Sequence, residues 1–402
     1  MFGRFDTRAA EKIVESFRFG IPPKDVITDF TVGRDGQIEE LRRLLYGGPY
    51  RQGRALLLKA NYGSGKSHML QLLRKTSLDS EYAVSMIVVD SQGGVRFNRM
   101  DSILGEIANK LESSKDKKPG IGSLFDAFYD AANMECNAGT AKVHLIIKNG
   151  APWGPGVPLK SPAVHAALRV WPAIAEDGKE LIEDWFANPS DYRGQRKLIY
   201  KTLVEPFLDT FQEPRTEMEF YSNDVFTFHT DGFQQSWDAI SDLDSISRAV
   251  GLGGLVLLFD EFEDIVQNLN RRELQKHAYS NLFRFFTGES FPGTAVFAVT
   301  PDFLERCTSE LQSVDVYDME VKGFAQLPTL SIDQISEEQF LSLAKRIRDV
   351  HGLAYGWDSN EAIGDRELEV MLSEFLKVSE PNRIRSAVQD LVSELDDRLE
   401  MR

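Results

Sequence analysis

The stretch Ala60-Asn61-Tyr62-Gly63-Ser64-Gly65-Lys66-Ser67 decides the fold, because it joins a predicted strand to a predicted helix through a glycine-rich turn. Residues 54–59 (RALLLK) before it form a short apolar run, and residues 68–75 after it show a helical pattern. A G-x-x-x-x-G-K-[ST] string between a strand and a helix is typical of a P-loop, which binds nucleotide phosphates. Ala60 stands where the first glycine of that string is expected, and its methyl group is tolerated if the residue has a negative φ. The alternative interpretation is a glycine-rich turn that binds no nucleotide.

The residue types in this stretch suit ATP and a magnesium ion. Gly63 and Gly65 let the backbone curl so that successive N–H groups point at phosphate oxygens, and the helix that begins near Lys66 adds the positive end of its dipole. We expect the Lys66 ammonium to reach the β- and γ-phosphates and the Ser67 hydroxyl to bind Mg²⁺. The predicted ATP-binding residues of this stretch are Asn61, Tyr62, Gly63, Ser64, Gly65, Lys66, Ser67 and His68.

A second stretch, residues 255–261 (LVLLFDE), runs through apolar residues into two carboxylates. If it is a buried strand of a parallel sheet, Asp260 emerges beside the P-loop and holds Mg²⁺ through a water molecule. Glu261 then faces the γ-phosphate, where it orients or deprotonates the attacking water. The alternative is an acidic strand end that caps the following helix.

Thr300 ends another predicted strand, residues 295–300 (AVFAVT). A polar side chain at this place hydrogen-bonds the γ-phosphate or the attacking water, which makes Thr300 a predicted catalytic residue. Thr300 is equally suited to cap the helix that begins at Pro301-Asp302, and the two roles are compatible. Arg306 is either an arginine finger toward a neighbouring subunit or, as we favour, an ordinary solvated arginine.

The pattern along the chain predicts an α/β fold in which a parallel sheet is flanked by helices. Near-continuous apolar strands alternate with helical patterns, which is typical of parallel sheets covered on both faces. We expect a core domain over 1–330, with a large, mainly helical insertion at about 95–250, and a C-terminal helical lid domain over 331–402. A separately folded module in place of the insertion is left open. The predicted strands are 54–59, 83–90, 255–260 and 295–300, and the predicted helices are 9–19, 37–45, 68–75, 100–111, 163–186, 197–211, 236–250, 337–350, 365–378 and 382–399.

Composition limits the class of protein. The chain has 46 Lys and Arg against 62 Asp and Glu, a formal net charge of −16, which argues against a protein that coats DNA but leaves a local basic groove open. Cys136 and Cys307 leave no room for a disulfide framework or a cysteine zinc site. Residues 252–259 form the longest near-continuous apolar run, far below the about 20 residues that span a bilayer. With no apolar stretch typical of a secretion signal in residues 1–17, we expect a soluble, cytoplasmic protein.

The order of these motifs resembles that of an AAA+-type P-loop ATPase. More narrowly, four segments resemble the ATP-binding proteins of bacterial BREX (bacteriophage exclusion) defence systems. The insertion and the last seventy or so residues match that family only in pattern. The four segments are FRFGIPPKDVITDFTVGR (17–34), KANYGSGKSHML (59–70), LVLLFDEFEDI (255–265) and AVTPDFLERC (298–307).

The resemblance implies further site residues. Val32 and Gly33 lie in a segment that resembles the one packing on the adenine and ribose of ATP, with a plain turn as the alternative. Arg383 opens a C-terminal helix that resembles the element whose arginine contacts the γ-phosphate, with Arg385 as the other candidate and a surface arginine as the plain reading. The resemblance also implies protein partners in a defence complex, with DNA bound directly or indirectly; a homo-oligomer is left open.

One weaker signal is a basic cluster made of Arg193, Arg196, Lys197 and Lys201, with Tyr192 and Tyr200 nearby. Positive charge beside aromatic rings is what single-stranded nucleic acid binds. The favoured interpretation is an ordinary solvated helix face, because Lys197 and Lys201 are spaced as an exposed i,i+4 pair.

Together these patterns predict an ATP-hydrolysing protein, and the resemblance implies that it works in a multi-protein anti-phage complex that acts at DNA. Lys66 and Ser67 hold phosphate and Mg²⁺, Asp260 completes the metal shell, and Glu261 activates water. The alternatives are a nucleotide-gated scaffold or signalling switch with negligible turnover, and a DNA-loading ATPase.

Overall fold

The computed structural model describes residues 5–46, 53–61, 63–89, 95–115, 118–137, 159–209, 223–262, 269, 271–313, 326–332, 335–375 and 383–401. Contacts divide the chain into two compact units. The terminal unit comprises Met1–Gly48, Leu58–Lys75 and Thr329–Arg402, and the central unit comprises Pro49–Leu57 and Thr76–Pro328. The predicted division into residues 1–330 and 331–402 stays a prediction.

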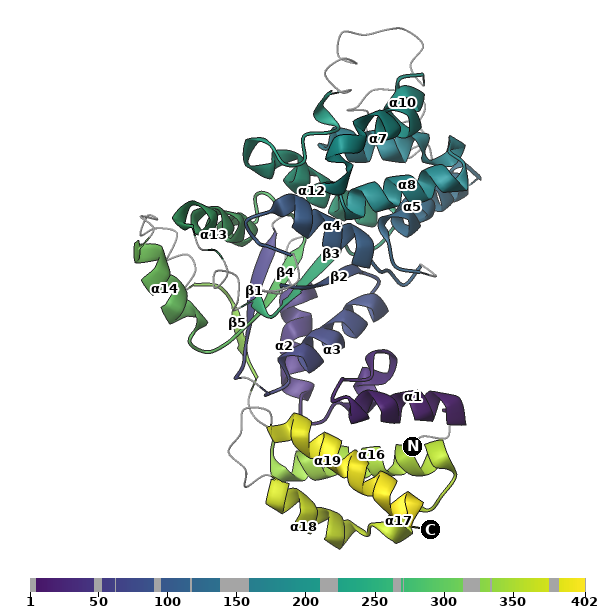
Figure 1. Cartoon of the computed structure of the whole chain (residues 1–402), viewed down its shortest axis with the longest axis vertical. Helices are drawn as coiled ribbons and strands as arrows, with labels where there is room; N and C mark the ends of the chain where they lie inside the picture. Colours follow the sequence, from purple (N-terminus) through teal and green to yellow (C-terminus); the bar gives the residue numbers. More distant parts are fainter. Residues whose placement is uncertain are drawn as a thin grey trace. The chain divides into compact units, whose positions relative to one another are not determined.

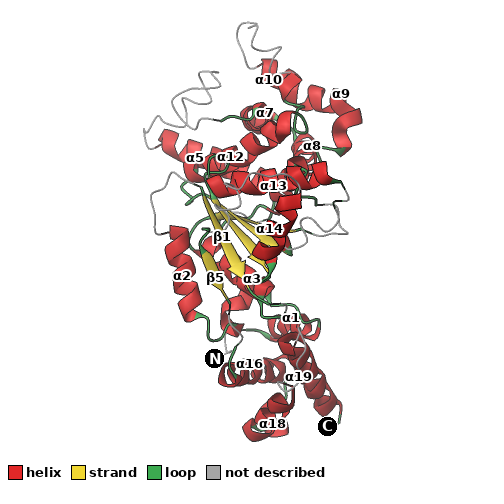
Figure 2. Cartoon of the chain, turned by 90° about the vertical axis from the view of Figure 1, so that its left-hand side faces the viewer, coloured by secondary structure: helices red, strands yellow, loops and turns green. Residues whose placement is uncertain are grey.

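The strands form one five-stranded sheet in the order β2-β3-β4-β1-β5, drawn in yellow in Figure 2. The pairs β2–β3 and β3–β4 are parallel, with Val88 opposite Asp260 and Phe259 opposite Phe297. Every residue of β3 is buried, as expected of a strand covered on both faces. The predicted parallel sheet flanked by helices is therefore confirmed, and the short β5 is an addition. The strands are β1 (Arg54–Lys59), β2 (Ala83–Val88), β3 (Leu255–Asp260), β4 (Thr294–Val299) and β5 (Thr329–Ser331).

The helices of the central unit and its strands share one hydrophobic core. The rings of Phe259 on β3 and Phe297 on β4 stack 4.8 Å apart, and the same cluster continues into the predicted insertion through Trp185 and Trp237. Helices α5, α7, α8 and α12 lie together on one side of the strands in both views (Figure 1, Figure 2). The helical elements are α4 (Met100–Lys110), α5 (Ile121–Asn137), α7 (Pro162–Val170), η2 (Trp171–Ala173), α8 (Glu176–Ala187), η3 (Asp191–Gln195), α9 (Arg196–Ile199), η4 (Tyr200–Val204), α10 (Glu205–Asp209), η5 (Asp231–Phe233), α12 (Gln234–Ala249), α13 (Arg272–Thr287) and α14 (Phe303–Ser313).

The single helical pattern expected over 163–186 is wrong in one respect, because the structure breaks it in two. Ser161 caps the first helix by accepting a hydrogen bond from the Val164 N–H at 3.3 Å. That helix, α7, ends before Trp171, and α8 begins only at Glu176. The cause is Pro172, which lacks the N–H that would continue the helix and whose ring clashes with the preceding turn.

The terminal unit joins the two ends of the chain in a second core. Helix α1 presents Ala10, Ile13, Val14 and Phe17 at helical spacing, and these side chains pack against α16 and α19 (Figure 1). None of the helices within the described ranges combines the length and apolarity needed to cross a membrane. The helical elements are α1 (Thr7–Arg18), η1 (Lys24–Phe30), α2 (Asp35–Tyr46), α3 (Lys66–Asp79, which runs on into the central unit), α16 (Glu337–Tyr355), α17 (Ser359–Ala362), α18 (Asp365–Phe375) and α19 (Arg383–Glu400).

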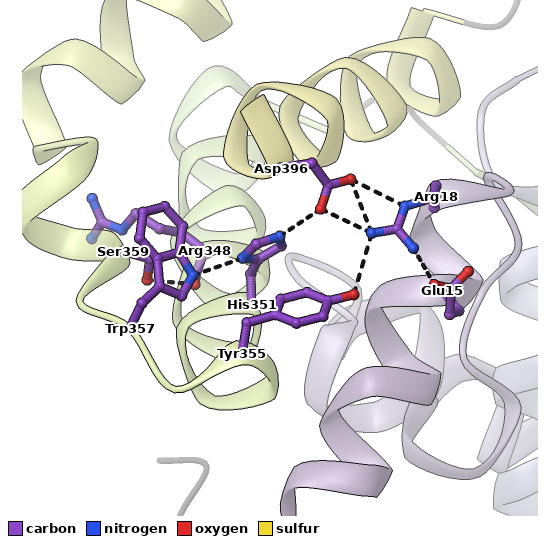
Figure 3. Close-up of polar contacts among 8 residues, drawn as sticks. All are labelled: Glu15, Arg18, Arg348, His351, Tyr355, Trp357, Ser359 and Asp396. Carbon is purple, nitrogen blue, oxygen red and sulfur yellow. Dashed lines mark hydrogen bonds and ion pairs between the residues drawn. The ribbon is translucent and has the colours of Figure 1, made fainter. Parts of the chain in front are cut away.

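A polar network fastens α1 to this core (Figure 3). The Arg18 guanidinium donates to both carboxylate oxygens of Asp396, at 2.8 and 2.9 Å from Nη2, and to the Tyr355 hydroxyl at 3.3 Å. His351, fully buried, lies 3.0 Å from Asp396 through its Nε2. Burial raises the pKa of Asp396, but the hydrogen bonds from Arg18 and His351 outweigh it and hold that pKa below its ordinary value.

The partners of His351 fix which ring nitrogen carries the proton. Trp357 Nε1 can only donate, and it lies 3.0 Å from His351 Nδ1. Nδ1 is therefore the acceptor, and Nε2 carries the hydrogen that is donated to Asp396. A second proton on Nδ1 would oppose the Trp357 N–H, and burial in addition lowers the pKa of His351.

We predict that Arg18→Ala loosens α1 from the terminal unit. Because the Arg18 and Asp396 side chains are 31% and 29% exposed, the lost pair is worth about 1 kcal/mol. Hydrogen exchange of the amides in residues 7–18 measures the opening free energy. Arg8→Ala on the exposed face of the same helix is the control and leaves exchange unchanged; equal effects of the two variants would contradict the prediction.

We also predict a stability change with pH that depends on His351. A lowered pKa means that the neutral ring contributes stability above about pH 6.5, and that this contribution is lost as the pH falls through the lowered value. In His351→Gln, whose amide can still donate to Asp396 and accept from Trp357, the loss of stability as the pH falls below about 6.5 should be smaller than in the wild type. Thermal melts across this range measure it, with the exposed His277→Gln as control. Identical profiles for wild type and His351→Gln would refute the role of the ring.

Candidate functional site

The turn between β1 and α3 has the backbone that the motif predicts. Gly63 has φ +71° and Gly65 has φ +95°, and residues with a Cβ atom rarely adopt these conformations. The Ser64 N–H donates to the Asn61 carbonyl at 3.2 Å, and the Met69 N–H donates to Gly65 at 2.9 Å, which starts the helix. Among the described residues the non-glycine positions with positive φ are Glu81, Phe233 and Glu261, so Ala60 accommodates its methyl group. Tyr62 lies outside the described residues.

The side chains at the start of α3 offer two different contacts to a ligand. Lys66 is buried to 9% exposure and Ser67 is exposed. Helix α3 is fourteen residues long, so its first N–H groups carry the positive end of a full helix dipole. The donor set of backbone N–H groups, ammonium and hydroxyl fits a triphosphate with its magnesium ion.

The segment before α2 is fastened to α3 through a histidine. Thr31 Oγ1 donates to the Ile27 carbonyl at 2.8 Å, and His68 Nε2 lies 2.9 Å from the same oxygen. A hydroxyl has one hydrogen, so the Nε2–H of His68 must donate to Thr31. Burial, and next the positive charge of Arg34, lower the pKa of His68 to about 4, so the ring is neutral at pH 7. His68 thus links the predicted adenine-side segment to α3.

Arg34 makes a second link of the same kind. It is 7% exposed, and its Nη2 donates to the Ser64 carbonyl inside the glycine-rich turn at 3.5 Å. Its own carbonyl accepts the first hydrogen bond of α2, from the Ile38 N–H at 2.9 Å. Thr31 and Arg34 lie in the segment 17–34, where the sequence predicted no role for either; an arginine directly after a turn glycine was the available signal.

Helix α16 contacts the same segment. Arg346 Nη1 donates to the backbone carbonyls of Asp29, at 2.6 Å, and Thr31, at 3.2 Å. Gly33 has φ +63°, and a Cβ there would lie 2.1 Å from Cδ of Gln339. Gln339 is at the same time part of the capping box of α16, where it accepts from the Ser336 N–H at 2.9 Å. Residues 29–33 therefore touch α16 as well as α3, and no sequence pattern indicated Gln339 or Arg346.

In the central unit the ends of β3 and β4 carry the other predicted residues. Asp260 is 5% exposed and its Oδ1 accepts from the Glu261 N–H at 3.0 Å. Glu261 is exposed and has φ +54°, a left-handed conformation. Because β3 and β4 are parallel and Phe259 pairs with Phe297, Asp260 and Thr300 emerge at the same edge of the sheet.

Thr300 makes a hydrogen bond that favours an ordinary arginine over an arginine finger at Arg306. Thr300 is 2% exposed, and its hydroxyl accepts from Arg306 Nη2 at 3.1 Å. The Arg306 guanidinium also pairs with Asp302 at 3.0 Å. Arg306, on α14, is thus engaged by two residues of the segment between β4 and that helix, Thr300 and Asp302.

The arginines proposed for the C-terminal helix are placed as follows. Arg383 is the first residue of α19, and its side chain lies outside the described residues. Arg385 is exposed and lies against the turn after α1, since a Cβ on Gly20 would be 2.7 Å from its Nε. The structure therefore brings Val32, Gly33, Ser64, Lys66, Ser67 and His68 into the terminal unit, and Asp260, Glu261 and Thr300 to one edge of the central unit.

Comparison with known proteins gives one family. The family model described as BREX system ATP-binding protein BrxC/D matches residues 5–144 and 231–400, well over half of the 402 residues. The matched ranges include the turn 60–67 and the ends of β3 and β4. No curated protein and no solved structure matched the chain.

The crowding at Gly33 leads to a prediction. In Gly33→Ala the positive φ costs about 1–2 kcal/mol, and the new methyl group displaces the Gln339 amide from its bond to Ser336. Amides at the start of α16 should then exchange faster, while those of α12 in the central unit do not change. Gly36→Ala, where nothing lies within 4 Å of the new Cβ, is the matched control. If the exchange rates of the α16 amides were the same in Gly33→Ala as in the wild type, the contact between Gly33 and Gln339 would not stabilise the helix.

Proposed function

The chain belongs to the family of BREX system ATP-binding proteins BrxC/D, and from that premise we propose that it binds Mg-ATP at the turn 60–67 and hydrolyses it. The observation that carries the proposal is the pair of left-handed glycines, Gly63 and Gly65, directly ahead of α3. Such a turn aims consecutive N–H groups at an anion, and the helix dipole adds to the attraction.

In the proposed complex the phosphates lie over Asn61, Tyr62, Gly63, Ser64 and Gly65, and Lys66 contacts the β- and γ-phosphates. Ser67 is a magnesium ligand and Asp260 holds the ion through water. Magnesium, when bound, neutralises charge that develops on the phosphate oxygens. Val32 and Gly33 lie against the base and ribose. His68 does not contact phosphate as a cation, because its ring is neutral and donates to Thr31.

Hydrolysis in this proposal depends on Glu261 as the base that orients and deprotonates water. Thr300 holds the γ-phosphate or that water, and Arg383 contacts the γ-phosphate from the lid. The exposure of Glu261 supports this role, since a carboxylate in contact with solvent can exchange the proton that it takes.

The output that we propose is movement of α16. The contacts of Arg346 and Gln339 with residues 29–33 give that helix a direct link to the adenine-side segment. Binding and loss of the γ-phosphate would shift the population of lid positions through this link. We propose a cytoplasmic setting in a multi-protein anti-phage complex that acts at DNA, with DNA bound directly or indirectly and a homo-oligomer left open; the family description of a BREX system component supports this setting.

Glu261→Gln and Lys66→Ala test hydrolysis and binding separately. We expect Glu261→Gln to lower steady-state phosphate release about 100-fold or more while the affinity for ATP is kept. Lys66→Ala should lose affinity for ATP, because it removes the cation nearest the β- and γ-phosphates. A phosphate-release assay measures hydrolysis, and calorimetry with Mg-ATP measures the affinity for the nucleotide.

Glu81→Gln is a matched control for the first variant. Glu81 is exposed and has φ +60°, close to the +54° of Glu261, so the control removes a carboxylate from the same backbone conformation. Phosphate release in Glu81→Gln should equal that of the wild type. A wild-type protein that binds Mg-ATP without releasing phosphate would instead indicate a nucleotide-gated scaffold, and absence of heat with Mg-ATP would overturn the proposal.

A further inference from the structure

The central unit contains a pocket that the proposed ATP site does not use. Its volume is about 180 Å³, and it lies where α8, η3 and α9 meet residues 226–229 and the start of α4. Helices α8 and α9 are labelled in Figure 2. All of its lining residues except Asp101 fall outside the ranges that the family model matches. The pocket is thus a feature of a segment that the family description does not cover.

Aromatic rings form the walls of this pocket. Trp185 is 2% exposed and packs edge-to-face on Phe228 with ring centroids 5.3 Å apart. Phe226 is half-buried, and the Arg196 guanidinium lies over its face at 4.6 Å. Trp185 and Phe228 therefore form the buried back of the pocket, and Phe226 is the ring among these three with surface open to an entering planar group. A volume of this size is below the roughly 300–1,000 Å³ of pockets that hold drug-sized ligands. The space suits one small flat group.

The rim of the pocket is positively charged in a chain with a net charge of −16. Arg193 and Arg196 line the pocket and are exposed, and Lys197 and Lys201 continue the exposed positive charge beyond it. The one lining carboxylate, Asp101, is 1% exposed and already bonded to Arg99 at 2.8 and 2.5 Å. It also lies 3.7 Å from Arg193. The exposed rim of the pocket therefore carries a net positive charge beside the aromatic walls.

We propose that this pocket takes one unstacked base of a single-stranded nucleic acid, with the neighbouring phosphates on Arg193, Arg196 and Lys197. Aromatic walls behind a cationic rim are the combination that holds single strands, since bases stack on rings and phosphates pair with cations. His229, also at the pocket, is exposed and has its pKa lowered by burial and by Arg193, so it is a neutral donor or acceptor for a base edge.

The observations favour a strand over the other ligands of similar chemistry. A free nucleotide would engage Arg193 and Arg196 but not the positive charge that continues to Lys201. A duplex keeps its bases stacked, so none could enter. An acidic peptide would pair with the arginines, but its carboxylates make no use of the aromatic walls. The inference goes beyond the proposed ATP hydrolysis and does not depend on it.

Fluorescence anisotropy with a labelled oligo(dT) of 20 nucleotides tests the proposal across a series of salt concentrations. Arg193→Ala/Arg196→Ala should weaken binding at least about tenfold and make the salt slope shallower by about 0.7 for each arginine removed. Phe226→Leu should weaken binding about five- to 100-fold with the salt slope unchanged, because it removes stacking and no charge. Lys66→Ala should bind the oligonucleotide as the wild type does, which separates this site from the ATP site.

A double variant elsewhere controls for the loss of two positive charges. Arg8→Ala/Lys12→Ala removes them from the exposed face of α1 and should leave binding unchanged. Equal loss in the two double variants, or no loss in either, would overturn the proposal. Binding of the duplex, of free dTMP or of a poly-glutamate peptide as tight as that of the single strand would also overturn it. An oligo(U) arm shows whether DNA or RNA is held more tightly, and absence of binding to both would refute the site.

Photocrosslinking keeps the test independent of variants that fold poorly. An oligonucleotide that carries one 5-iodouracil, irradiated on the wild-type protein, should form its adduct with Trp185, Tyr192, Phe226 or His229. Adducts confined to residues outside the pocket would show that the base does not enter it.

Discussion

The terminal unit depends on one constraint, the position of residues 29–34 between two helices. Arg34 and Thr31 attach this segment to the glycine-rich turn and to α3, while Arg346 and Gln339 attach it to α16. Gly33 permits the arrangement because its backbone has φ +63° and a Cβ there would displace the Gln339 amide from its place. A displacement of the segment toward one helix must therefore change its contacts with the other.

Two neutral histidines, His68 and His351, join elements of this unit through hydrogen bonds of fixed direction. In both, a partner hydrogen bond fixes the protonated nitrogen: Thr31 has already used its hydrogen, and the Trp357 indole can only donate. Burial lowers the pKa of His68 and of His351, so each ring links two elements without bringing a charge into the core. The cation that joins α1 to α19, Arg18, is instead placed where water reaches it.

The parallel sheet and the backbone of the glycine-rich turn could be predicted because their signals are local. An apolar run such as residues 255–260 and the glycines 63 and 65 carry their structure in adjacent residues. The split between α7 and α8 was equally local, in Pro172, and was overlooked. Gln339, Arg346 and the bond from Arg18 to Asp396 could not be predicted, because each joins residues more than 300 positions apart. The pocket of the central unit has a similar origin: the basic cluster was visible in the sequence, but the aromatic walls come from two separated segments, 185–192 and 226–228.

Glu261 illustrates a conflict between the stability of the fold and the catalytic role that we propose for this residue. The chain turns sharply after Asp260, and Glu261 takes a left-handed backbone conformation. For a residue other than glycine this conformation costs about 1–2 kcal/mol of stability. Selection for stability alone would favour glycine or asparagine at this position. A glutamate at this position therefore lowers the stability of the fold. Substitutions selected only for a higher melting temperature would tend to replace it.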